Sequence, residues 1–114
     1  MKDPITFKVG KNKYYWEGDI LMIEEEKEWK IFTGIIEYPN SKQWYENGKR
    51  HRTDGPADIR SGEEIWYYGG KRHRLNGPAV IRGNFKEYWI NGMRFDKDDW
   101  IKMARKIKLE KLLS

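Results

Sequence analysis

Two histidines are the most obvious reactive side chains of this sequence. His51 and His73 occupy the same place in two similar stretches. Asp54 follows His51 closely, and imidazole together with carboxylate can bind Zn²⁺ or Ni²⁺. A histidine base needs a third group to orient it, however, and Asn76 stands in the second stretch where Asp54 stands in the first. We therefore expect each histidine to bond a neighbouring turn, with ligand contact, metal binding and catalysis as the alternatives.

Five arginines recur with the histidines. Arg50, Arg72 and Arg94 share one position of the pattern, and Arg52 and Arg74 share another. Guanidinium groups bind phosphates and carboxylates, and neighbouring Trp and Tyr rings could stack on bases. The alternative, which we favour, is that each arginine lies across an aromatic ring of its own sheet in a cation–π contact.

These repeated side chains define a candidate partner-binding surface. Its residues are Arg50, Arg52, Arg72, Arg74, Arg94, Trp44, Tyr45, Trp66, Tyr67, Trp89, His51 and His73. The sequence contains no phosphate-binding glycine loop, no nucleophile elbow and no paired carboxylates. We therefore predict that the protein is not an enzyme and holds no cofactor or metal.

The repeated positions belong to a 22-residue repeat. The segment from Trp44 to Ala57 returns as the segment from Trp66 to Ala79, and a third copy begins at Tyr88. A fixed period of this length is typical of one supersecondary unit stacked several times, and such stacks are mostly binding surfaces.

Each repeat contains two turn signals. Asn47-Gly48, Gly69-Gly70 and Asn91-Gly92 favour a type I′ hairpin turn, which needs a positive φ at both residues. Asp54-Gly55-Pro56 and Asn76-Gly77-Pro78 mark a second stop, where we expect the glycine to supply an unusual φ. The pattern predicts a mainly β chain, an elongated antiparallel meander of 22-residue β-hairpin repeats.

Adjacent aromatic residues indicate how the meander packs. Trp44 and Tyr45 must point to opposite faces of a strand, as must Trp66 and Tyr67. Both faces are then half apolar, which fits an elongated sheet wrapped on itself. An aromatic column left exposed would be a docking surface.

We expect a single domain over residues 1–114. Residues 1–43 would form an N-terminal cap with a degenerate repeat, residues 44–95 the repeats and residues 96–112 a C-terminal capping helix. Asp96 is the predicted N-cap of this helix. Its apolar face contains Trp100, Met103, Ala104 and Ile107, whereas the leucines at 109, 112 and 113 leave that face, so the last turn should fray or meet a partner.

The amino-acid composition limits the kinds of structure and function that the chain can have. Of the 114 residues, 38% are apolar, 36% are charged and 15% are aromatic, which argues for a thin structure without a thick core. The net charge of +5 fits ordinary solubility or, alternatively, nucleic-acid binding. The chain has no cysteine, no apolar run at Met1–Pro4 and no stretch long enough to span a membrane, so we expect a cytoplasmic protein.

The repeat resembles a known sequence family. The phrase W-Y-x-N-G-K-x-H-R-x-D-G-P-A, complete at Trp44–Ala57, is similar to a repeat of uncharacterised proteins from tailed phages and giant viruses. The match covers roughly residues 33–95. More distantly, the Tyr-x-Asn-Gly phrases resemble MORN-type repeats, which form β-hairpin arrays for protein or lipid contact. The resemblance implies a virus-encoded interaction module and carries no catalytic residues.

Our leading hypothesis is a non-enzymatic module that binds a host or viral protein, as an inhibitor or an antitoxin-like partner. The alternative is binding of nucleic acid or a nucleotide along the arginines. A weaker alternative is a virion or assembly component that self-associates through the leucines of its tail. The sequence leaves the partner and the oligomeric state open.

Overall fold

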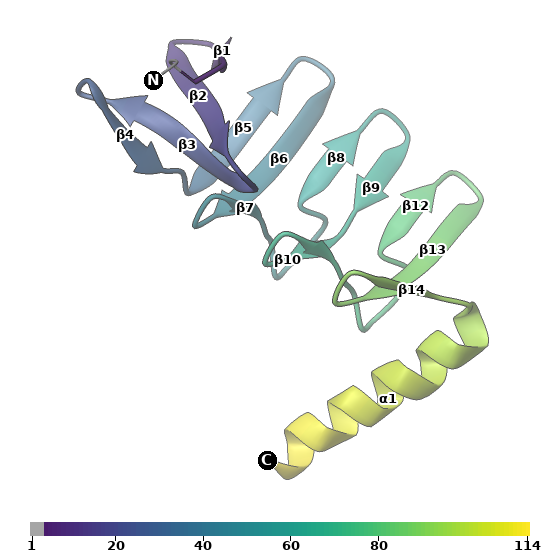
Figure 1. Cartoon of the computed structure of the whole chain (residues 1–114). Helices are drawn as coiled ribbons and strands as arrows, with labels where there is room; N and C mark the ends of the chain where they lie inside the picture. The colour runs from purple at the N-terminus through teal and green to yellow at the C-terminus, as the bar shows by residue number, and fades with distance from the viewer. Residues whose placement is uncertain (1–3) are drawn as a thin grey trace.

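The computed structural model describes residues 4–114 and consists of short antiparallel strands followed by one helix (Figure 1). The elements are β1 (Thr6–Val9), β2 (Asn12–Glu17), β3 (Ile20–Glu25), β4 (Glu28–Ile31), β5 (Gly34–Tyr38), β6 (Ser41–Glu46), β7 (Lys49–Arg50), β8 (Asp58–Arg60), β9 (Glu63–Ile65), β10 (Tyr67–Tyr68), β11 (Lys71–Arg72), β12 (Val80–Arg82), β13 (Phe85–Ile90), β14 (Met93–Phe95) and α1 (Lys97–Leu113). The predicted mainly β fold with a C-terminal helix is confirmed. Residues 1–3 of the predicted N-terminal cap lie outside the described part.

The hairpins form two rows along the molecule (Figure 1). Long hairpins β5–β6, β8–β9 and β12–β13 make one row, and short hairpins β6–β7, β10–β11 and β13–β14 make the other. One large sheet joins the long hairpins to β14 and β7 of the short ones, in the order β14-β13-β12-β9-β8-β6-β5 with β7 paired to β6, and β10–β11 forms a small sheet of its own. The result is an elongated molecule of 48 × 35 × 25 Å.

The short hairpins turn as their sequences predict. Asn47 and Gly48 have φ values of 52° and 78°, and Asn91 and Gly92 have 49° and 81°. The same pair of positive φ values occurs at Gly69 and Gly70, 57° and 84°. Two positive φ values in succession define the type I′ turn, whose twist matches the flanking strands.

The second glycine of each repeat has a different role from the one expected. Gly55 and Gly77 do not adopt a positive φ. A Cβ atom at Gly55 would instead lie 2.8 Å from the guanidinium carbon of Arg52, and one at Gly77 would lie 2.9 Å from that of Arg74. The loops therefore need glycine for space, because an arginine side chain packs directly against the backbone.

A row of buried side chains crosses the large sheet. Cross-strand neighbours place Gln43, Asp58, Ile65, Val80 and Glu87 side by side on β6, β8, β9, β12 and β13. Their exposed fractions are all 8% or less. Three polar residues thus share the interior with two aliphatic ones, and each polar residue needs a partner there.

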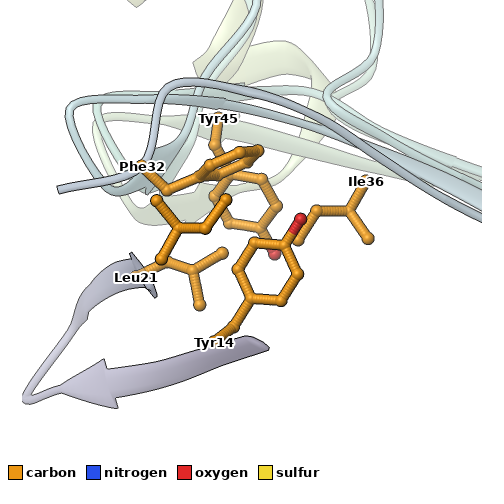
Figure 2. Packing of buried hydrophobic residues seen from close by; sticks show 6 residues of the cluster. Tyr14, Leu21, Phe32, Ile36 and Tyr45 are labelled. Carbon is orange, nitrogen blue, oxygen red and sulfur yellow. The ribbon is translucent and has the colours of Figure 1, made fainter. Parts of the chain in front are cut away.

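The N-terminal strands β1–β4 form a separate four-stranded sheet that packs on the start of the array. Figure 2 shows the rings of Tyr14, Phe32 and Tyr45 gathered with Leu21 and Ile36 in the core that joins the two parts. The backbone continues the connection at Gly48, which donates to Phe32 O at 2.7 Å and accepts from Leu21 N at 2.8 Å.

Helix α1 closes the other end. Asp96 caps it by accepting a 2.9 Å hydrogen bond from the Asp99 N–H, the first-turn contact that the sequence indicates. Trp100 and Ala104 are its buried residues, and Ile101 packs beside them, whereas Met103 is 37% exposed. The predicted apolar face was therefore wrong at Met103. In residues 4–114, no helix has the length and apolarity of a membrane span.

Candidate partner-binding groove

Arg52 and Arg74 hold the loops that follow the short strands. The Arg52 guanidinium lies 4.0 Å from the ring centroid of Trp44, and that of Arg74 lies 3.8 Å from Trp66. Arg52 Nη1 donates to the Pro56 carbonyl at 3.1 Å, and Arg74 makes the equivalent bond to Pro78. Both guanidinium groups are thus engaged by the protein's own rings and carbonyls.

Asp54 extends this arrangement in the first loop only. Its carboxylate accepts from Arg52 Nε at 2.9 Å, and this bond lowers the pKa of Asp54 below its usual value. Asn76 occupies the equivalent place in the second loop. The exchange removes one negative charge there and leaves Arg74 without a carboxylate of this kind.

Arg50, Arg72 and Arg94 face the buried row of the sheet. Arg50 Nη1 lies 3.9 Å from Asp58 Oδ2. Glu87 forms ion pairs with two arginines: its Oε1 lies 3.6 Å from Arg72 Nη1, and its Oε2 lies 3.5 Å from Arg94 Nη1. The guanidinium groups therefore neutralise the carboxylates that the sheet buries.

Two of these arginines also lie over aromatic rings. Arg50 stands 5.6 Å from the ring centroid of Tyr67, and Arg72 stands 5.1 Å from that of Trp89. Tyr45 is buried instead, and its hydroxyl donates to Gln43 at 2.7 Å; burial raises the pKa of this tyrosine. The predicted aromatic columns are therefore covered largely by arginine stems, with cation–π geometry at both pairs.

The histidines connect successive short hairpins. His51 Nδ1 accepts from the Gly69 N–H at 2.9 Å, and His73 Nδ1 accepts from the Asn91 N–H at 3.0 Å. The other ring nitrogen of His51, Nε2, lies 3.1 Å from a carboxylate oxygen of Glu46 and is not paired with Asp54. Burial, followed by the charge of Lys111, lowers the pKa of His73.

At the last repeat, Trp100 of α1 replaces the arginine that packs on the aromatic ring of each earlier repeat. It packs on Tyr88 with ring centroids 4.9 Å apart, at the place where Arg52 packs on Trp44 and Arg74 on Trp66. Its indole N–H donates to the Arg74 carbonyl at 3.0 Å. The helix thus ends the series of stacked pairs with an aromatic residue in place of an arginine.

A cavity of about 380 Å³ opens between two successive loops. Its walls come from the loop after β7, from the loop after β11, and from two aromatic residues between them: Arg52, Thr53, Asp54, Gly55, His73, Arg74, Leu75, Asn76, Trp66 and Tyr68. Tyr68 is 55% exposed and lies between the rings of His51 and His73, with centroids 4.5 and 5.7 Å away. Of the predicted site residues, the cavity therefore gathers Arg52, Trp66, His73 and Arg74.

A second cavity, of about 370 Å³, adjoins the first at Leu75, which lines both. Its other walls belong to α1: Trp100, Ile101, Ala104, Arg105, Lys108, Leu109 and Leu112. We call the two cavities together the loop–helix groove. One half is polar and aromatic, the other is largely aliphatic.

The predicted site includes four of the groove residues and omits the others, among them the whole α1 wall, Tyr68 and Leu75. Tyr68 and Leu75 carry a sequence signal of their own. Both stand where the repeat departs from its own pattern, since Glu46 precedes Tyr68 by one period and Thr53 precedes Leu75 by one period. The departures themselves, an aromatic and an aliphatic residue at polar positions, were the available signal.

Comparisons with protein-family models, with curated proteins and with solved structures found no match for this chain. The resemblance to a phage and giant-virus repeat and to MORN-type repeats therefore stays a prediction.

Proposed function

We propose that the protein is a non-enzymatic module that binds another protein through the loop–helix groove. The observation that supports this most directly is the junction at Leu75, where a polar, aromatic cavity meets an aliphatic one. Protein interfaces combine these features, with apolar and aromatic side chains at the centre and polar groups at the rim.

The contacts of the arginines favour a protein over a nucleic acid. Binding along the phosphate backbone needs guanidinium groups that are free to replace counterions. Arg50 and Arg72 already face Asp58 and Glu87, and their side chains are 29% and 31% exposed. A phosphate chain would compete with buried carboxylates for these groups.

The sequence resemblance supports a virus-encoded protein that acts on a host or viral partner. A role as an inhibitor or as an antitoxin-like partner fits a small module without catalytic groups. Assembly into a virion is the third hypothesis, and it requires self-association.

Affinity capture tests the proposal. The tagged protein is immobilised and exposed to lysate of its source or host cell, with and without nuclease treatment and at low and high salt. We expect a retained protein whose amount falls with Tyr68→Ser and stays unchanged with Phe85→Ser. Phe85 is a matched control, because it is 48% exposed and lies at the tip of the long hairpin β12–β13.

Three results would count against the proposal. Recovery of material that nuclease or salt removes would favour nucleic acid, above all if Arg94→Ala also abolished it, because Arg94 is the most exposed arginine of its set. Equal retention of the partner by the Tyr68 and Phe85 variants would show that the partner does not bind at the loop–helix groove. Self-association in sedimentation, with no second protein retained, would favour assembly.

A further inference from the structure

We propose that the helix half of the loop–helix groove binds an acidic amphipathic helix of a partner protein. This inference rests on the proposed function and names the chemistry of the partner. It concerns α1, whose outer half lies beyond the residues that the sheet buries.

Exposed leucines are the first reason. Leu109 and Leu112 are 55% and 83% exposed, and both line the groove on the helix surface that also carries the half-buried Ile101. Isolated exposed apolar residues are ordinary, but a contiguous set beside a cavity is typical of a docking surface. The leucines thus offer apolar area that a partner can bury.

The spacing of the lining residues defines the shape of the partner. Ile101, Arg105, Lys108 and Leu112 follow one face of α1 at intervals of four, three and four residues. Leu75 forms the facing wall, so the surface is concave rather than flat. From residue 101 to residue 112 the face is about 17 Å long, which matches a partner helix of about three turns.

Charge defines the chemistry of the partner. Arg105 and Lys108 stand within the apolar face, and among residues 4–114 neither forms an ion pair. Carboxylates that flank the leucines or aromatic residues of a partner helix would pair with both. A second copy of α1 laid alongside in parallel would bring like charges together and is disfavoured.

An anionic membrane is the other surface that attracts basic amphipathic helices. Such helices place their cations opposite the apolar face, which itself has to enter the lipid. Here Arg105 and Lys108 lie among the groove residues, and the apolar face is hollowed between α1 and Leu75. These features favour a protruding side chain over a flat lipid surface.

Synthetic peptides test the inference on the intact protein. The probe is a fluorescein-labelled 16-residue (about four-turn) peptide with leucines at helical spacing and glutamates beside them. A second peptide has the same composition in scrambled order, and a third has lysine in place of glutamate. Fluorescence anisotropy at physiological salt should show binding of the first peptide and binding at least about tenfold weaker of the other two.

Matched variants locate the binding on the protein. Leu112→Ser should weaken the acidic peptide at least about fivefold, and Leu113→Ser less than about twofold, since these neighbours are almost equally exposed and only Leu112 lines the groove. Arg105→Glu should weaken it at least about fivefold and Lys106→Glu less than about twofold. Circular dichroism checks that every variant keeps its fold.

The outcomes separate this inference from the proposed function. Failure of the acidic peptide to bind, equal binding of the scrambled peptide, or equal effects of Leu112→Ser and Leu113→Ser would overturn the inference. Binding only to vesicles of phosphatidylserine and phosphatidylcholine would overturn it in favour of a membrane. Capture of a protein that depends on Tyr68 but not on Leu112 would leave the proposed function intact and reject the acidic helix.

Discussion

At the scale of single residues, the glycines of the type I′ turns show that one sequence signal can serve two purposes. Gly48 and Gly92 share a positive φ, but a Cβ at Gly48 would overlap the Ile20 side chain and lie 3.1 Å from Leu21 backbone atoms. At Gly92 the nearest atom belongs to Lys71, at 3.6 Å. The first turn is therefore also a packing surface for the N-terminal sheet.

This difference predicts unequal effects of one substitution. Gly92→Ala should lower the free energy of unfolding by about 1 kcal/mol, because alanine resists a positive φ. Gly48→Ala should lower it by about 2–4 kcal/mol, because the overlap with Ile20 adds to the same strain. Urea denaturation followed by tryptophan fluorescence measures both, and equal losses would show that Ile20 moves aside freely.

Two aspartates provide a second comparison. Asp54 and Asp58 each accept from an arginine two residues away, Arg52 and Arg60. Asp58 is fully buried, whereas the Asp54 side chain is 83% exposed. Asp58→Ala should lower the free energy of unfolding by about 3 kcal/mol, because it leaves the charges of Arg50 and Arg60 uncompensated. Asp54→Ala should leave it nearly unchanged, and chemical denaturation of the two variants in parallel checks this.

His73 predicts a dependence of stability on pH. Burial and Lys111 hold its pKa in the folded state below the ordinary value of about 6.5. The unfolded chain therefore binds the proton more tightly than the folded protein does. The stability that the neutral His73 ring contributes is fully present above about pH 6.5 and is lost as the pH falls through the folded-state pKa of His73. Protonation would also remove the acceptor of the Asn91 N–H.

The matched variant is His73→Asn, whose amide oxygen can accept the same hydrogen bond and does not titrate. We expect the melting temperature of the wild type to fall more steeply than that of the variant between pH 7 and pH 5. Parallel curves would mean that His73 keeps its ordinary pKa in the folded protein.

At the scale of elements, α1 depends on one side chain for its attachment. Trp100 packs on Tyr88 and donates to the Arg74 carbonyl, so it contributes both apolar burial and a hydrogen bond. Trp100→Phe should lower the free energy of unfolding by about 1 kcal/mol, through the lost hydrogen bond. Trp100→Ala should lower it by about 3–5 kcal/mol.

Thermal and urea unfolding monitored by circular dichroism at 222 nm distinguish these two variants. A loss of helical signal before the sheet unfolds in Trp100→Ala would show that α1 detaches on its own. An unchanged transition in that variant would mean that the indole contributes nothing to the attachment.

At the scale of the whole molecule, the two ends have separate cores. Ile23 belongs to the cluster under the N-terminal sheet, and Trp100 belongs to the cluster under α1. Ile23→Val combined with Trp100→Phe should therefore lower the free energy of unfolding by the sum of the single effects, to within about 0.5 kcal/mol. A larger deviation in equilibrium urea denaturation would show that the array transmits strain from one end to the other.

The sequence predicted what local chemistry decides. The Asn-Gly turns and the Asp96 cap depend only on neighbouring residues, so their geometry follows from residue type. The role of Gly55 does not, because it depends on where the Arg52 side chain lies. Leu75 was missed for a similar reason, because it becomes significant only where a helix from the end of the chain lies beside it.

The row of buried side chains has a consequence for how the chain folds. Hairpins of similar sequence could pair out of order, because similar turns and aromatic residues recur in them. The interior positions differ, however: Asp58 is followed at the equivalent place by Val80, and Gln43 by Ile65 and Glu87. A swapped order would separate Asp58 from Arg50 and Glu87 from Arg72, the arginines that neighbouring hairpins contribute. Different residues at equivalent interior positions thus distinguish the hairpins from one another. Only the native order of hairpins gives every buried polar residue its partners.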